Sequence, residues 1–295
     1  MWFFVSDLHG RIDRYRKLFE MAVREGPAAV LLGGDLLPSG LAHANRGIRL
    51  QPDFSAVECA DADFIRDVMA SGFAALRDRL GAASPKVFAI LGNDDPRVEE
   101  EGLVEAAPRG GWEYLHDRCA ECEGVQVYGY GFVPPTPFLL KDWERYDVSR
   151  YVDPGCSSPE EGWRSVPVSP GDVKYGTIQD DLKRLAGDQS MAGSVWLFHA
   201  PPHQTALDRA GLDGVMVDHA PVDVHVGSIA IRRFIETRQP LVTLHGHIHE
   251  SARLTGSWRQ QIGRTWALSA AHDGAELALV RFDPREPANA TRELI

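Results

Sequence analysis

Short apolar runs that end abruptly on polar residues recur along the whole chain. Near-continuous apolar runs of this length are typical of strands that are covered on both faces of a sheet. We therefore expect strands at residues 1–6, 28–33, 86–91, 125–131, 194–199, 240–245, 265–270 and 275–282. Between several of them, apolar residues recur at three- and four-residue steps, which predicts amphipathic helices beginning near residues 12, 64 and 229. Strands that alternate with helices favour an α/β fold.

Residues 132–176 break this rhythm, because they hold seven prolines together with Trp143, Tyr146, Tyr151 and Trp163. A long irregular segment inside a compact domain is typically a functional lid, an interface or a disordered loop. The large aromatic residues argue against disorder. A linker between two domains is the alternative, but the strands that follow are too few for a second domain. We therefore expect one domain over residues 1–295, with 132–176 as an irregular insertion.

Polar side chains follow five of the predicted strands at the point where each strand ends. The five segments read SDLHG at residues 6–10, GGD at 33–35, GNDD at 92–95, HAPPH at 199–203 and HGHIH at 245–249. In α/β sheets, ligands bind in the crevice beyond the carboxyl ends of the strands. Side chains two apart on an extended chain point the same way. We therefore expect Asp7 and His9 to reach one ion together, and likewise His247 and His249.

Each of these fragments is a weak signal by itself. Short motifs occur by chance, and a lone histidine on an apolar strand is most often a core residue. Five fragments in this order, each at a strand end, predict a metal site. The mixture of carboxylate, amide oxygen and imidazole suits Mn, Fe, Zn, Co or Ni.

Together, the five segments resemble the motifs of the calcineurin-like metallophosphoesterase superfamily: D-x-H, G-D, G-N, a separate His and G-H-x-H. The resemblance covers most of the chain. It implies a four-layer αββα sandwich of two mixed β-sheets flanked by helices, with two divalent metal ions at one end. By position, it implies Asp7, His9 and His249 as ligands of one ion, Asn93, His199 and His247 as ligands of the other, and Asp35 as a bridge. A shared carboxylate suits two ions held about 3.5–4 Å apart.

The chemistry of such a pair of ions predicts a phosphoesterase. Two divalent ions can deprotonate a bridging water near neutral pH and hold phosphate oxygens while the hydroxide attacks in line. They also neutralise acidic residues that would otherwise repel a phosphoester. The sequence has neither G-x-x-x-x-G-K-[ST] nor G-x-S-x-G, the motifs of a P-loop and of a serine hydrolase.

Asp94 departs from the pattern that the resemblance implies. Many members of that superfamily carry a histidine here, which is thought to protonate the leaving oxygen. An ordinary aspartate has a pKa of about 3.9 and is ionised at neutral pH, so Asp94 can act as the acid only if burial raises its pKa. The alternatives are that His203 donates the proton, or that the leaving group needs little help. Since some relatives without this histidine act on phosphodiesters, the resemblance favours a phosphodiester substrate.

Three further residues are candidates for binding the substrate. Arg11 and Arg97 lie near predicted ligands in the sequence and can grip a phosphate oxygen. His225 lies in a polar loop before the helix near residue 229 and can line the pocket. Solvated surface positions are the alternative for all three. His245 points away from His247 if the strand stays extended, which favours a structural role.

The formal net charge of -11, from 42 acidic and 31 basic residues, opposes non-specific binding to nucleic acid or to an anionic membrane. We expect no membrane-spanning helix and no signal peptide, because the sequence lacks a run of about 18 apolar residues and a basic leader. The four cysteines are expected to be reduced thiols of a cytoplasmic protein. The spacing of Cys119 and Cys122 leaves a metal or redox role as the alternative.

These patterns predict a cytoplasmic, metal-dependent phosphoesterase that acts on a small phosphoester, and they leave a homo-oligomer open. A non-catalytic protein-binding scaffold on the same fold is the second hypothesis, and the presence of all seven ligand residues argues against it. A nuclease is the third, and the acidic charge without a basic stripe argues against that.

Overall fold

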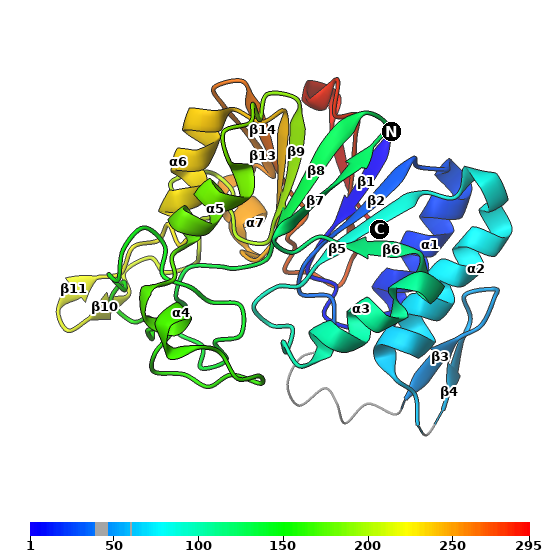
Figure 1. Cartoon of the computed structure of the whole chain (residues 1–295), viewed down its shortest axis with the longest axis horizontal. Coiled ribbons are helices and arrows are strands. Elements are labelled where there is room, and N and C mark those ends of the chain that lie inside the picture. The colour runs from blue at the N-terminus through cyan, green and yellow to red at the C-terminus, as the bar shows by residue number, and fades with distance from the viewer. Residues whose placement is uncertain (39–46, 60) are drawn as a thin grey trace.

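The computed structural model describes residues 1–38, 47–59 and 61–295. Two six-stranded sheets pack face to face, and helices cover their outer faces, so the chain forms four layers (Figure 1). Both sheets are mixed: antiparallel pairing occurs at one edge of the first sheet and at both edges of the second, and the remaining strands are parallel. The predicted αββα sandwich is confirmed.

The first sheet carries the N-terminal strand in its interior. Its order is β16 (Thr291–Leu294), β15 (Ala278–Phe282), β1 (Trp2–Val5), β2 (Ala29–Gly33), β5 (Lys86–Ile90) and β6 (Trp112–Tyr114). Strands β1, β2, β5 and β6 are parallel, whereas β15 runs antiparallel to β1. The carboxyl ends of the four parallel strands therefore lie at the same end of this sheet.

The second sheet repeats this arrangement with later parts of the chain. Its order is β13 (Arg259–Ile262), β14 (Thr265–Ser269), β12 (Val242–His245), β9 (Ser194–Phe198), β8 (Val125–Tyr130) and β7 (Arg118–Cys122). Its four middle strands are parallel, and both edge strands run antiparallel to their neighbours. Two short hairpins lie outside the sheets, and they pair β3 (Ile48–Leu50) with β4 (Ala56–Glu58) and β10 (Met216–Val217) with β11 (Ala220–Pro221).

The helices divide between the two outer faces (Figure 1). The first sheet is covered by α1 (Ile12–Glu25), α2 (Ser71–Leu80) and α3 (Glu99–Gly110), and the second by α5 (Ile178–Ala186) and α6 (Ile229–Arg238). The remaining helical segments are short, namely η2 (Phe64–Ala70), which is a π-helix leading into α2, η3 (Gly81–Ala83), α4 (Pro170–Tyr175), α7 (Ser251–Thr255) and η4 (Pro287–Asn289). Within the described ranges, no helix combines the length and apolar character needed to cross a membrane.

The inner strands are buried on both faces, as the apolar runs predict. In β1, Trp2 and Phe4 belong to the core between the sheets, whereas Phe3 and Val5 pack with the residues of α1. Successive strand residues face opposite sides of a sheet, so this two-sided burial requires an unbroken apolar run. Each run ends where the strand leaves the sandwich, and the polar residues begin there.

The insertion at residues 132–176 is irregular up to α4 and is held by buried polar contacts. Lys141 Nζ lies 2.6 Å from Glu144 Oε2, and both side chains are fully buried. The carboxylate of Asp142 accepts a hydrogen bond from the backbone N–H of Arg97 at 2.7 Å, just before α3. Asp147 accepts one from the N–H of Ile229 at 2.6 Å, at the start of α6. The insertion is therefore fastened to helices on both sides of the sandwich.

Candidate metal centre

All seven predicted ligands lie just beyond the carboxyl ends of parallel strands. Asp7 and His9 follow β1, Asp35 follows β2, and Asn93 follows β5, all in the first sheet. The other three come from the second sheet: His199 follows β9, and both His247 and His249 follow β12. The two sheets thus bring their ligands to a common place at one end of the sandwich.

The first group of ligand atoms comes from Asp7, His9, Asp35 and His249, all within 4.8 Å of one another. The Nε2 atoms of His9 and His249 are 3.1 Å apart, and His249 Nε2 lies 3.3 Å from Asp7 Oδ1. Two imidazole nitrogens and two carboxylates that converge on one point are a ligand set for a divalent transition metal ion.

The second group comes from Asp35, His199 and His247, again within 4.8 Å. His199 Nε2 lies 3.2 Å from Asp35 Oδ2 and 3.0 Å from Asn93 Oδ1, which adds the amide oxygen to this group. Asp35 belongs to both groups, so its carboxylate stands between two positions that can each hold a cation.

The backbone at the ligands is not extended, contrary to the expectation for the D-x-H and H-x-H spacing. Asp7, His9, Asp35 and His247 have positive φ angles of 55°, 47°, 51° and 73°. This left-handed conformation costs free energy in residues that have a side chain, and the residues that adopt it cluster at functional sites. The strands end at Val5 and His245, and tight turns rather than strand pleating bring the paired side chains together.

Two glycines leave the space that the ligand side chains fill. A Cβ at Gly92 would lie 2.6 Å from His199 Nε2, and one at Gly246 would lie 2.7 Å from Asp7 Oδ2. Real Cβ atoms do not approach other atoms so closely, so a larger residue at either position would displace a ligand. The packing of the backbone around these donors therefore fits a metal centre with this ligand set.

Asp95 holds two of the ligand-bearing loops together. Its fully buried carboxylate accepts hydrogen bonds from the backbone N–H groups of Leu36, Leu37 and Gly92, at 3.1, 2.7 and 2.9 Å. Burial and the neighbouring charge of Asp35 raise the pKa of Asp95 to about 7, despite these donors. No sequence pattern predicts these contacts of Asp95, because only the fold brings the loops after β2 and β5 together.

The carboxylates favour positive charge at the centre. Burial by itself would lower the pKa of His9, but its hydrogen bond to Asp94 and the charges of Asp35 and Asp7 raise that pKa to about 9. In the same way, Asp35 overcomes the burial of His199 and raises its pKa to about 9. Groups that hold protons on imidazoles so strongly also attract cations, which compete with those protons for the same nitrogens.

The outer nitrogens of two ligand histidines are held by hydrogen bonds. His199 Nδ1 lies 2.8 Å from the carbonyl oxygen of Gly33, and His9 Nδ1 lies 3.1 Å from Asp94 Oδ2. Acceptors at Nδ1 keep that proton there and leave Nε2 free to bind a metal. His245 differs, because both of its nitrogens are bonded inside the protein, to Ala200 O and Thr243 Oγ1, each at 2.8 Å.

A cavity of about 790 Å³ opens beside the ligand groups. On one side it is lined by His9, Asp35, Asn93, Asp94 and the two histidines after β12. The insertion and the segment from His203 to Ile229 form the other walls. Hence the irregular insertion at residues 132–176 and the loops that carry the candidate ligands line one cavity.

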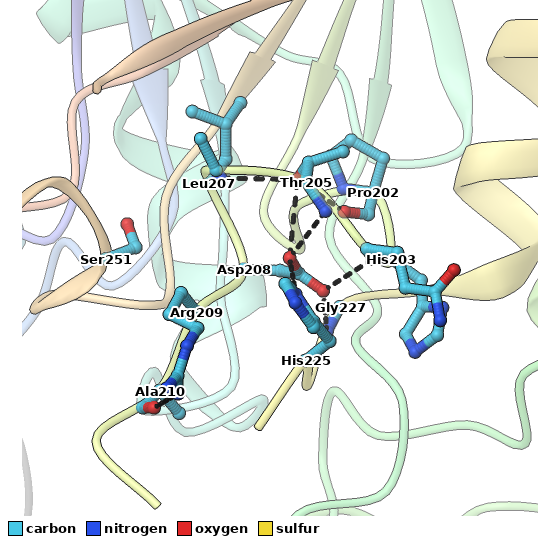
Figure 2. Close-up of polar contacts among 12 residues, drawn as sticks. Pro202, His203, Thr205, Leu207, Asp208, Arg209, Ala210, His225, Gly227 and Ser251 are labelled. Atoms are coloured by element: carbon cyan, nitrogen blue, oxygen red, sulfur yellow. Dashed lines mark hydrogen bonds and ion pairs between the residues drawn. The ribbon is translucent and has the colours of Figure 1, made fainter. Parts of the chain in front are cut away.

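His203 and His225 both line this cavity, and a buried carboxylate orients the second. His225 Nδ1 lies 2.8 Å from Asp208 Oδ1, and Asp208 is fully buried (Figure 2). The same carboxylate accepts the backbone N–H groups of Thr205 and Gly227, at 2.8 and 3.2 Å. His203 Nε2 lies 3.4 Å from the half-exposed Asp223. Sequence patterns did not single out Asp208, because a carboxylate that binds a loop has no periodic signal.

The two candidate arginines lie outside the cavity lining. Arg11 pairs with Asp13 at 3.5 Å before α1. The guanidinium of Arg97 lies 5.1 Å from the ring centre of Trp143 and pairs with Glu100 at 3.2 Å. Their role in binding a phosphate stays a prediction, whereas His225 lies in the cavity wall.

Comparisons with known proteins point to one family. The family model described as calcineurin-like phosphoesterase matches residues 3–251. A crystal structure of the Thermus thermophilus protein TT1561 is 17% identical, covers 99% of this chain and 97% of its own, and has a TM-score of 0.53. A second crystal structure is 18% identical, covers 99% of this chain and 98% of its own, and has a TM-score of 0.59. No curated protein matches in sequence.

Proposed function

The chain belongs to the calcineurin-like phosphoesterase family, whose members use two divalent metal ions, and we propose that it hydrolyses a phosphoester at a dinuclear centre. The ligands of one ion would be Asp7, His9 and His249, those of the other Asn93, His199 and His247, with Asp35 between them. The observation that carries this proposal is the position of Asp35, which belongs to both groups of converging ligand atoms.

When bound, the two ions would supply an activated water and positive charge for the phosphate oxygens. The other roles belong to residues of the chain. Asp94 accepts a hydrogen bond from His9 Nδ1 and keeps Nε2 directed at the first group. We propose that His203 donates the proton to the leaving oxygen and that His225, which Asp208 holds in place, binds the substrate in the same cavity wall.

We propose a phosphodiester rather than a phosphomonoester as the substrate. None of the described residues that line the cavity is a lysine or an arginine. A monoester carries up to two negative charges near neutral pH, and a diester carries one, so the diester needs less positive charge from the walls. The same lack of basic residues, with the net charge of -11, supports a small substrate over nucleic acid. The cytoplasmic location and the oligomeric state stay predictions.

The decisive experiment is a pair of assays on the Mn²⁺-loaded protein. Bis(4-nitrophenyl) phosphate is the diester and 4-nitrophenyl phosphate the monoester, and we expect the diester to be hydrolysed with the larger kcat/KM. Asp35→Asn should abolish both activities, since it weakens both ion sites. Activity that survives in Asp35→Asn would contradict a centre that depends on this carboxylate. No activity with Mn²⁺, Zn²⁺, Co²⁺, Ni²⁺ or Fe²⁺ would contradict the proposal and favour the non-catalytic scaffold.

A further inference from the structure

We infer that the substrate carries a large apolar organic group without a charge of its own, and that this group occupies the cavity beside the ligand cluster. The inference rests on the proposed function, because it concerns the part of the phosphoester that does not react. Four properties of the cavity support it: the character of the walls, the character of the rim, the sign of the charged groups and the volume.

The walls away from the ligand cluster are mostly apolar. The insertion supplies Pro134, Pro135, Pro137, Phe138, Val148 and Pro154. The opposite wall comes from residues 210–229 and includes Leu212, Val215, Val217, Val222, Val226 and Ile229. Binding sites of this kind derive most of their affinity from apolar surface removed from water.

The apolar surface continues to the rim. Phe138, Tyr151 and Val215 line the cavity and yet are 63, 68 and 42% exposed. Met216, next to Val215 in the β10–β11 hairpin, is 55% exposed. This hairpin lies beside the insertion at one end of the molecule (Figure 1). Exposed apolar residues that gather at the mouth of a cavity are typical of a site for an apolar ligand.

The charged groups in the wall select against a second anionic group. Besides the ligand cluster, the cavity is lined by the acidic residues Asp94, Asp147, Asp153, Asp223 and Glu250, and no lysine or arginine lines it among the described residues. Asp147 is engaged by the N-terminus of α6, and Asp94 and Asp223 lie 3.1 and 3.4 Å from ring nitrogens of His9 and His203. No lysine or arginine of the described lining offsets the charge of Asp153 and Glu250. Additional phosphates or carboxylates on the substrate would meet repulsion there.

The volume fits a group much larger than the phosphate. A cavity of about 790 Å³ lies within the range of roughly 300–1,000 Å³ that is typical of sites for drug-sized ligands. An alkyl or aromatic group of medium length therefore has room in it. Nucleoside di- and triphosphates have comparable size, but their extra charges oppose the acidic wall.

A set of phosphodiesters that share one leaving group tests the inference. Methyl, butyl, hexyl and 5-carboxypentyl 4-nitrophenyl phosphate release the same nitrophenol, so differences in kcat/KM report only on the second group. We expect kcat/KM to rise along the alkyl series by up to about fourfold per buried methylene. The carboxypentyl ester, which matches the hexyl ester in length, should fall at least about tenfold below it. Equal rates for the methyl and hexyl esters, or a preference for the carboxylate, would overturn the inference.

A variant of the protein with a charge in the apolar wall tests the same inference. Val217→Asp should reduce the ratio of hexyl to methyl kcat/KM severalfold. Val104→Asp, at an exposed position of α3 outside the cavity, should leave that ratio unchanged. An unchanged ratio in Val217→Asp would count against the apolar site, provided that its urea unfolding curve matches that of the wild type.

Binding measurements separate this inference from the proposed function. Calorimetric titration with methyl phosphate and with hexyl phosphate needs no turnover, and we expect the hexyl compound to bind at least about tenfold more tightly. If the protein hydrolyses none of the esters but keeps this difference, the proposed function fails and the apolar site stands. If it hydrolyses the methyl ester and shows no difference in binding, the apolar site fails and the proposed function stands.

Discussion

The carboxylate of Asp94 lies 3.1 Å from His9 Nδ1, while Nε2 of the same ring faces His249 Nε2 at 3.1 Å. An ionised carboxylate suits this position, because it accepts the Nδ1–H hydrogen bond and keeps Nε2 as a lone-pair donor to the ion. A histidine in its place would act differently, as a proton donor. We therefore propose that Asp94 positions His9, and that the proton for the leaving oxygen comes from another group in the cavity.

Asp94→Ala should weaken binding of the ions by about 10–100-fold, the usual effect of losing an outer partner of a ligand histidine. Asp94→Asn keeps a carbonyl oxygen that can accept the hydrogen bond from His9, so its affinity for the ions should fall much less. Calorimetric titration of the metal-free protein with Mn²⁺ measures both. Asp13→Ala, at a half-exposed carboxylate near Arg11, is the control, and equal affinities for the alanine and asparagine variants of Asp94 would refute the positioning role.

His203→Ala should lose far more activity on an alkyl leaving group than on nitrophenolate, because only the alkoxide needs a proton as it leaves. We expect kcat/KM to fall about 10²–10³-fold for dihexyl phosphate and less than about tenfold for hexyl 4-nitrophenyl phosphate. His225→Ala should instead lose similar factors on both esters, as expected of a residue that binds substrate. Equal losses on both esters in His203→Ala would remove His203 as the donor.

That the seven candidate ligand residues lie together could be predicted from sequence, because they follow apolar strands in a fixed order of motifs. Asp95 and Asp208 could not, since each works by accepting hydrogen bonds from loop N–H groups that only the fold brings near. The turn conformations of Asp7 and His247 were missed for a related reason. Residue spacing alone does not distinguish an extended pair from a pair on a tight turn.

At the scale of elements, the insertion is ordered by a buried ion pair. Lys141 and Glu144 are fully buried and 2.6 Å apart, and Lys141 Nζ also donates to the carbonyl oxygen of Thr136 at 2.9 Å. A charge left alone in such a place is costly, so each side chain needs the other. Since the insertion forms one wall of the cavity, this pair supports the site from a distance.

Lys141→Met should therefore reduce the free energy of unfolding by about 3–5 kcal/mol, the usual effect of removing one partner of a buried pair. Urea unfolding followed by circular dichroism measures the change. Arg150→Met removes a half-exposed partner of Glu160 and should cost less than about 1 kcal/mol. A similar loss in the two variants would show that the buried pair does not order the insertion.

The strands in the middle of both sheets were predictable, because burial on both faces demands unbroken apolar runs. The edge strands β7 and β16 were not predicted, and their sequences, RCAEC and TREL, are largely exposed and polar. The helix α3 was missed as well, since it contains Pro108 near its end and three glutamates in its first turn. Elements with one solvent-facing side depend on packing more than on a pattern in the sequence.

For the whole molecule, the assignment of one domain to residues 1–295 stays a prediction. Overall stability should depend on pH through His116, a partly buried histidine that packs among aromatic side chains. His116 lies between β6 and β7, with its ring centre 4.7 Å from that of Trp143 and 5.1 Å from that of Phe132. Its Nδ1 accepts the N–H of Gly131 at 3.0 Å. Burial, and then the charges of Arg97, Arg145, Arg184 and Arg118, lower the pKa of His116 to about 3.

Because the pKa of His116 is about 3 when folded and 6.5 in its reference state, the unfolded chain binds the extra proton between these values. The free energy of unfolding should therefore fall as the pH drops from 6.5 toward 3, by at most about 1.4 kcal/mol per pH unit from this residue. In His116→Asn, which keeps an acceptor for Gly131, the loss between pH 7 and pH 5 should be smaller by about 2 kcal/mol. Urea unfolding at the two pH values tests this, and equal losses in both proteins would exclude His116 as the source.

The position of β1 has a consequence for the order in which the molecule can assemble. β1 lies between β2 and β15 and pairs Trp2 with Phe282, while His9 and His249 meet across 240 positions of sequence. During synthesis, the emerging N-terminal half can pair β1 with β2 at once, but its other edge stays open until β15 leaves the ribosome. Open edges of apolar strands invite aggregation. Each candidate ligand group takes residues from both sheets, so ions bound there would stabilise the finished fold and would not guide its early steps.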